Sequence, residues 1–286
     1  DKMSSVLDIV YKKPKTFGGS LSASFLGVSA HAEGNVNDKF TYLVGIRYKS
    51  NSYMLKSMET SGDYKPNFFD TQMLLTWKLG NHWNLDFLGN FSRNKFKYIP
   101  HDRETNFGTF TIAQRFTVYF DGQEVDQYAN YLGGLTLSYH PNEHHLFRAI
   151  LSSYYAKESE TYDIQSQYWL SDLEADLGSD DDEVAQATSM RSVGTFLEHA
   201  RNYLTAVVTA LDFRGQHKYS NNQVDWGIKV QNEIIHDQIR EWERNDSSGF
   251  TLPHIHTTPG EMVPYDDPSR ILNSSYFFAT KNALNT

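Results

Sequence analysis

Phe40-Thr41-Tyr42-Leu43-Val44-Gly45-Ile46-Arg47-Tyr48-Lys49 is the stretch that decides the fold. Its large apolar residues recur at every second position, so in an extended strand they point to one side. The residues between them point to the other side and end in the charged Arg47 and Lys49. This period of two predicts a β-strand with one apolar face and one more polar face.

The same alternation returns along the chain. It is clear in 72–79, 83–91, 130–139 and 224–230. It is weaker in 145–155, where Arg148 marks the polar face but Ile150 and Tyr154 share it, and in 203–214, where only Asp212 and Arg214 mark that face. These stretches predict an all-β chain whose strands carry two different faces.

The connections between these stretches differ in length in a regular way. Short, turn-rich connections lie at 36–39, 80–82, 141–144 and 220–223, and long ones at roughly 53–69, 98–127, 161–200 and 244–272. An antiparallel up-and-down meander with tight turns at one end and long loops at the other is typical of outer-membrane barrels.

Aromatic residues of the apolar face gather near the ends of the expected strands. One group lies beside the tight turns and another toward the long loops, as expected where a barrel wall crosses two headgroup regions. None of the residues assigned to the apolar face is charged, but the same faces would also suit the core of a soluble protein. The first group is Trp77, Trp83, Tyr139, Phe213 and Trp226, and the second is Tyr48, Phe91, Tyr155 and Tyr203.

The composition excludes several classes of function. The chain of 286 residues has 26 basic and 35 acidic side chains and a net charge of −9, which argues against a nucleic-acid partner. It contains no cysteine, so disulfides, thiolate zinc sites and cysteine nucleophiles are excluded. We find no catalytic or nucleotide-binding motif, and therefore expect no enzyme activity and no cofactor.

The first residues resemble a known family. Ser4 to Pro14 is similar to the end of the plug domain of TonB-dependent outer-membrane receptors, of the type Gly-Gly-x-Ile-Asn-Ile-x-Thr-Lys-Lys-Pro. Serines stand for the two glycines, Asp8 for the Asn and Tyr11 for the Thr. Phe17 to Phe25 then looks like the first barrel strand, followed by a very short loop near Gly27 and a second strand that ends near Asn35. The chain most resembles the large receptors of Bacteroidetes-type bacteria.

The resemblance implies how the chain is organised. Residues 1–15 would be the end of the plug domain, and 16–286 the first part of a transmembrane barrel, with about ten of its roughly 22 strands. Because Asp1 is no start residue and the last strand has no closing turn, we expect the chain to be a segment of a longer protein with an open sheet edge.

The resemblance also implies a function. Such a receptor imports a bulky nutrient (an iron chelate, a cofactor, an oligosaccharide or a peptide) across the Gram-negative outer membrane. Its partners are outer-membrane lipid, the nutrient and a periplasmic TonB-type energy-coupling protein. A passive or structural barrel such as a porin or adhesin stays an alternative, and so does a secreted all-β enzyme or glycan-binding protein.

Three expected loops carry candidate ligand-binding residues. The acidic run 178–183 offers carboxylates to Ca²⁺, although it lacks the spaced pattern of a calcium loop. His254 and His256, with His236 nearby in sequence, offer imidazoles to a transition metal, but no cysteine or well-placed acid completes a site. Asp102 and Arg103 follow a strand at the outer rim, where Arg103 could contact an anionic ligand. Ordinary solvated loops and a rim ion-pair network are the alternative interpretations.

Overall fold

The structure is a computed structural model that describes residues 9–56, 61–108, 113–173, 187–246 and 272–285. Within these ranges it holds twelve strands and one short helix. The helix is α1 (Ser52–Lys56). The strands are β1 (Gly18–Ser24), β2 (Gly27–Val36), β3 (Phe40–Ser50), β4 (Gly62–Tyr64), β5 (Asn67–Lys78), β6 (Trp83–Pro100), β7 (Arg103–Gly108), β8 (Ala113–Asn142), β9 (His145–Leu173), β10 (Ala187–Tyr219), β11 (Asn222–Asp246) and β12 (Leu272–Asn285).

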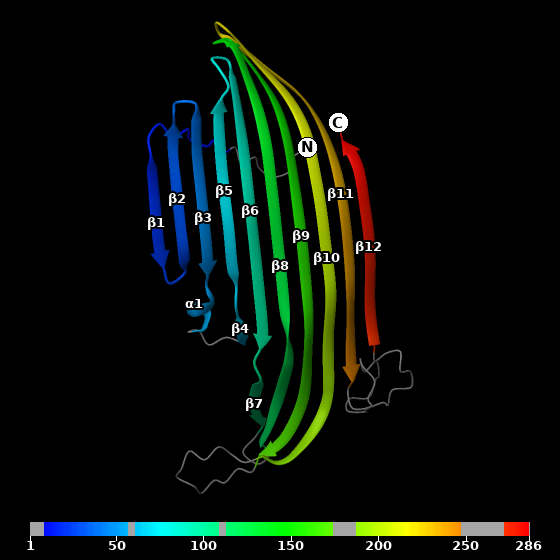
Figure 1. Ribbon diagram of the computed structural model, residues 1–286. Helices are drawn as coiled ribbons and strands as arrows, with labels where there is room; N and C mark the ends of the chain where they lie inside the picture. Colours follow the sequence, from blue (N-terminus) through cyan, green and yellow to red (C-terminus); the bar gives the residue numbers. More distant parts are fainter. Residues whose placement is uncertain (1–8, 57–60, 109–112, 174–186, 247–271, 286) are drawn as a thin grey trace.

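The strands form one antiparallel sheet that rises and falls along the chain (Figure 1). Its order is β1-β2-β3-β5-β6-β8-β9-β10-β11-β12, while β4 pairs with β6 and β7 with β8. The predicted all-β meander is therefore confirmed, and its main path has the ten strands expected. No pairing joins β1 to β12 among the described strands, so the sheet is open.

Tight turns gather at one end of the sheet, which we call the turn end, at the top of Figure 1. Between β2 and β3, Asn37 and Asp38 have φ of 58° and 49°, in the left-handed region that Asn and Asp adopt in tight turns. Between β8 and β9, the Asn142 side chain accepts hydrogen bonds from the backbone amides of His144 and His145. The local sequence therefore favours sharp reversal at this end.

The strand register sorts the side chains into two faces, because directly paired residues lie on the same side of a sheet. Phe40 pairs with Trp77 and Tyr48 with Phe69, on the side that we call the aromatic face. Arg47 pairs with Asp70 on the opposite side, the polar face, where the two side chains form an ion pair of 2.7 Å. The predicted assignment of alternate residues to two faces is confirmed here.

The sheet lacks a conventional hydrophobic core. Among the described residues, the only buried apolar side chains are those of Val118, Ala156, Ala200 and Ala210. Large apolar side chains lie exposed on the aromatic face instead, for example Leu135 at 42% and Ile228 at 65%. An apolar surface this extended is rare on a soluble monomer.

The strands are longer than their hydrophobic alternation predicts. The segments 113–127, 161–173 and 187–200 were expected in long loops, but they extend β8, β9 and β10 to 30, 29 and 33 residues. Apolar residues in these extensions occur only in short runs, such as Phe116, Val118 and Phe120 on one face of β8, and polar or charged residues interrupt the runs although the backbone stays paired. Another expected loop contains α1 and β4.

The chain that precedes β1 lies against the polar face. Tyr11 donates a hydrogen bond to Gln72 at 3.3 Å, and the Lys13 ammonium lies 3.5 Å from the Asp86 carboxylate. Lys12 forms an ion pair of 2.6 Å with Glu33 of β2. These contacts tie the segment to β2, β5 and β6, far from it in sequence.

Candidate functional site

Two rows of aromatic rings cross the aromatic face. The turn-end row contains Phe40 and Trp77, with ring centroids 5.0 Å apart, and Trp83 and Tyr139, 4.4 Å apart. The second, which we call the far row, links four neighbouring strands through centroid distances of 5.9, 4.8 and 5.8 Å. Its members are Phe69, Phe91, Tyr131 and Tyr155.

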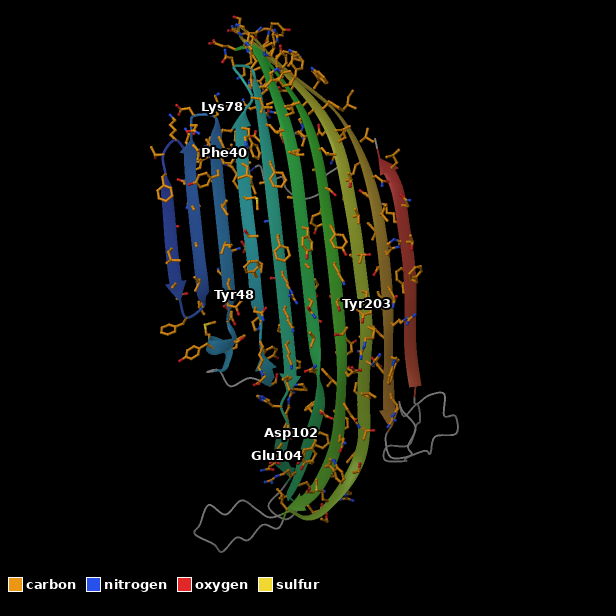
Figure 2. All side chains as sticks on the ribbon, viewed as in Figure 1. Phe40, Tyr48, Lys78, Asp102, Glu104 and Tyr203 are labelled. Carbon is orange, nitrogen blue, oxygen red and sulfur yellow. The ribbon has the colours of Figure 1, made fainter. Side chains whose placement is uncertain are left out.

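The two rows keep a constant separation. With Tyr48 added to the far row and Phe147 to the turn-end row, five strands carry one ring of each row eight positions apart. The pairs are Phe40 and Tyr48 on β3, Trp77 and Phe69 on β5, Trp83 and Phe91 on β6, Tyr139 and Tyr131 on β8, and Phe147 and Tyr155 on β9. Eight residues span about 27 Å along a strand, or about 20 Å along the axis at a barrel's usual tilt, slightly less than the ~25 Å apolar band of transmembrane barrels. Tyr48 and Tyr203 lie at a similar height on distant strands (Figure 2).

Beyond the far row, the polar face becomes acidic. We call the acidic side chains in 124–129, 157–162, 198–203 and 238–243 the acidic band. Two pairs are directly opposed across strands, Asp126 with Glu160 and Glu198 with Glu243. Like charges in such positions are destabilising and give this part of the sheet a negative potential that favours cations. The members are Glu124, Asp126, Glu158, Glu160, Glu198, Glu241 and Glu243.

The protonation of the acidic band reflects this crowding. Burial and then the neighbouring Asp126 carboxylate raise the pKa of Glu124 above its ordinary value. Burial and then Glu243 likewise raise the pKa of Glu198. Both shifts oppose ionisation, because desolvation and a nearby like charge each disfavour the charged form.

Replacing Glu198 with glutamine should raise the free energy of unfolding at neutral pH by about 0.2–1 kcal/mol, the range of one cross-strand pair. Because folding raises the pKa of Glu198, the ionised Glu198 carboxylate destabilises the fold in full only at pH values above that raised pKa. This destabilisation by Glu198 decreases as the pH falls toward 4.5, the ordinary pKa of a glutamate side chain. Thermal unfolding at pH 7 and pH 4 measures both effects. Glu143→Gln, in the exposed turn after β8, removes the same charge, and an equal gain from it would contradict the prediction.

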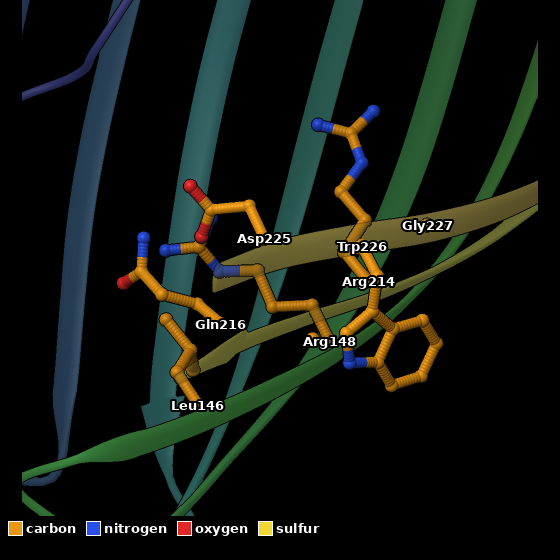
Figure 3. A pocket seen from close by; sticks show the side chains of 8 residues that line it. Leu146, Arg148, Arg214, Gln216, Asp225, Trp226 and Gly227 are labelled. Atoms are coloured by element: carbon orange, nitrogen blue, oxygen red, sulfur yellow. The ribbon is translucent and has the colours of Figure 1, made fainter. Parts of the chain in front are cut away.

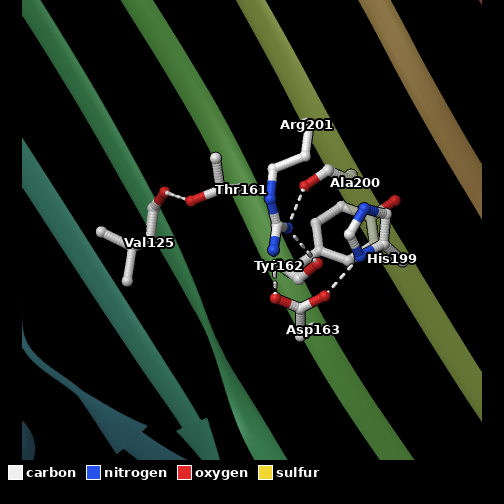
Figure 4. A network of polar contacts seen from close by, with 7 residues as sticks. All are labelled: Val125, Thr161, Tyr162, Asp163, His199, Ala200 and Arg201. Carbon is white, nitrogen blue, oxygen red and sulfur yellow. Dashed lines mark hydrogen bonds and ion pairs between the residues drawn. The ribbon is translucent and has the colours of Figure 1, made fainter.

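A second polar cluster lies on the aromatic face beyond the far row (Figure 4). Asp163 of β9 accepts hydrogen bonds from Arg201 and His199 of β10, and the His199 ring stacks on Trp242 at 4.6 Å. Burial opposes ionisation of Asp163, but the hydrogen bonds from Arg201 and then His199 outweigh it and lower its pKa. The cluster therefore holds an ionised carboxylate and fastens β9 to β10.

A pocket of about 580 Å³ lies near the turn end (Figure 3). Arg148 and Arg214 pair directly across β9 and β10, and both line the pocket with Gln216 and Asp225. The Asp212 carboxylate holds the Arg214 guanidinium at 2.6 Å. Arg148 forms no ion pair among the residues that the structure describes, so the pocket offers one guanidinium to an anionic group.

The structure gives Asp102 and Arg103 an anchoring role. The Asp102 carboxylate accepts a hydrogen bond of 2.7 Å from the backbone amide of Phe120, and the Arg103 guanidinium lies 5.6 Å from the Phe120 ring centroid. Both contacts fasten the chain around β7 to β8, near the far end of the sheet (Figure 2). The two residues therefore lie at the end of the sheet opposite the tight turns.

Other predicted ligands are not brought together. His254, His256 and the acidic run 178–183 lie outside the described residues, as do residues 4–8 of the plug-like motif. His236 contacts Thr280 of β12 at 3.2 Å. No group of three or more potential metal ligands occurs within the described ranges. Sequence reasoning missed the acidic band, although Glu158-x-Glu160 and Glu241-x-Glu243 place acids on one face.

Comparison of the chain with known protein families, curated proteins and solved structures finds no match in any of the three. In the part of the chain that the structure describes, no helix has the length and apolar character needed to cross a membrane.

Proposed function

We propose that this chain forms part of the wall of a TonB-dependent receptor in the Gram-negative outer membrane. The carrying observation is the exposed aromatic face, bounded by two rows of rings eight residues apart on five strands. Hydrocarbon lipid would cover the apolar residues between the rows, and the rings would lie at the two headgroup regions. In this arrangement the polar face lines the interior of the barrel.

The segment before β1 supports the receptor over a plain barrel. Its contacts Tyr11–Gln72 and Lys13–Asp86 lie on the polar face, where the end of a plug domain enters a barrel interior. The motif that leads into this segment is the one that resembles the plug. The protein would then import a bulky nutrient, with a periplasmic TonB-type protein supplying energy and no covalent chemistry involved.

Two other functions would require different structural features from this sheet. A passive porin or adhesin would have the same wall but needs no chain segment fastened to the polar face. A secreted all-β enzyme or glycan-binding protein needs a hydrophobic core, whereas the buried apolar residues described here are one valine and three alanines. A receptor would explain both the chain segment fastened to the polar face and the small number of buried apolar side chains.

Conductance of the full-length protein in planar lipid bilayers tests the proposal. We expect little steady conductance from the intact protein and a large, steady conductance after deletion of the segment that ends at Pro14. A steady open channel in the intact protein would favour the passive barrel. A full-length protein that stays monodisperse in buffer without detergent would exclude both membrane functions.

A further inference from the structure

Charges just beyond the far row are sorted by sign between the two faces. In the stretches 93–98, 124–129, 157–162, 198–203 and 238–243, the charged residues of the aromatic face are Lys and Arg, and the nearest acid on that face is Asp163, which forms an ion pair with Arg201. The polar face of the same stretches carries the acidic band but no Lys or Arg. Solubility alone requires no such sorting, because interspersed charges of both signs serve it as well. The basic side chains, which we call the basic band, are Arg93, Lys95, Lys97, Lys157, Arg201 and Arg240.

The basic band begins directly beside the far aromatic residues. On β6 the next aromatic-face residue after Phe91 is Arg93, and on β9 Lys157 follows Tyr155 in the same way. On β10, Arg201 lies two residues from Tyr203. A cation in this position lies at the depth where lipid headgroups begin, immediately outside the apolar band.

We propose that the basic band binds the phosphate groups of lipid headgroups in the leaflet at the far row. The inference rests on the proposed membrane location and adds a lipid partner to it. A phosphate is an anion with several acceptor oxygens, so Lys and Arg side chains at headgroup depth match it in charge and hydrogen bonding.

The register provides space for a phosphate group. Arg93, Ala129 and Lys157 lie in one row across β6, β8 and β9. Neighbouring strands are about 4.8 Å apart, so the two basic residues are about 10 Å apart on either side of a small alanine. Arg93 donates to Gln127 at 3.0 Å, which orients its guanidinium. Lys95, Lys97 and Lys157 form no ion pair among the described residues, so no carboxylate competes with a phosphate group for their ammonium groups.

The turn-end row offers no such band. The aromatic-face residues next to it include Leu79, His145 and Val224, and none of them is Lys or Arg. The two edges of the apolar band therefore differ in charge. This asymmetry assigns lipid phosphate to the far row alone.

Native mass spectrometry of the full-length protein in detergent, with lipid A as the probe, tests the inference. Lipid A carries two phosphates, and its dephosphorylated form has the same acyl chains. We expect lipid A to remain bound, and Arg93→Gln/Lys95→Gln/Lys157→Gln to bind it at least about tenfold more weakly. The control Lys78→Gln/Lys218→Gln/Lys229→Gln removes the same charge from the polar face near the turn end and should bind as the wild type does.

Two outcomes would overturn the inference. Equal binding of lipid A and its dephosphorylated form would show that acyl chains alone are recognised. An equal response of the two triple variants would show that net charge, not the basic band, decides affinity. Both outcomes leave the membrane location intact, whereas a protein that needs no detergent would refute that location itself. Far-UV circular dichroism checks that each variant is folded.

Discussion

Replacement of Leu135 with arginine should lower the free energy of unfolding in a lipid bilayer by about 2–4 kcal/mol, the cost of a basic residue at mid-bilayer in a β-barrel. Leu135 lies midway between Tyr131 and Tyr139, and its side chain is 42% exposed on the aromatic face. Urea unfolding of the full-length protein reconstituted in lipid vesicles measures the loss.

The neighbouring residue provides a matched control. Thr136 lies on the polar face and pairs with Asp86, so an arginine there meets a carboxylate and not lipid. Thr136→Arg should therefore change the free energy of unfolding far less than Leu135→Arg. Losses of similar size would show that the aromatic face is not in contact with hydrocarbon.

Replacement of Gly122 with alanine should destabilise the far parts of β8 and β9 by about 2–4 kcal/mol. Gly122 has φ of 103°, which side-chain-bearing residues rarely adopt, and an added Cβ would lie 1.8 Å from the backbone oxygen of Asp163. Because that oxygen belongs to a paired strand, either β8 or β9 must move. Hydrogen exchange of the amides in 113–127 and 160–173 should accelerate.

Gly133 of the same strand is the control for this substitution. A Cβ added at Gly133 meets no atom within 4 Å, so Gly133→Ala should leave hydrogen exchange near that of the wild type. If both variants exchange alike, the close approach of β9 at Gly122 is not a constraint on the fold.

The sheet could be predicted from sequence where one face is apolar. Phe40 to Tyr48 shows its strand by period two, and the turn Asn37-Asp38 shows the reversal, because both signals are local. The parts of β8, β9 and β10 beyond the far row could not be predicted in this way. Polar and charged residues interrupt their short apolar runs, and the strands are held by backbone pairing between residues distant in sequence, such as Tyr128 with Glu158.

The candidate site was predicted less completely than the fold. The rows of rings on one face could be predicted because their positions follow directly from the strand ends. The acidic and basic bands depend on the register between five strands, as in the row that joins Arg93 to Lys157. The contact of Asp102 with the Phe120 amide likewise depends on where β7 pairs, which the mixed charges of that loop do not specify.

The lengths of β9 and β10 separate the far tips of these strands electrostatically from the far row. From Tyr155 to Leu173, β9 continues for eighteen residues, or about 60 Å along the strand. Ions at physiological strength screen surface charges within about 8 Å, so in the proposed membrane location the field of a lipid surface at the far row would fade long before the strand ends. Charged groups at the far tips should therefore attract ligands independently of the lipid composition of the membrane.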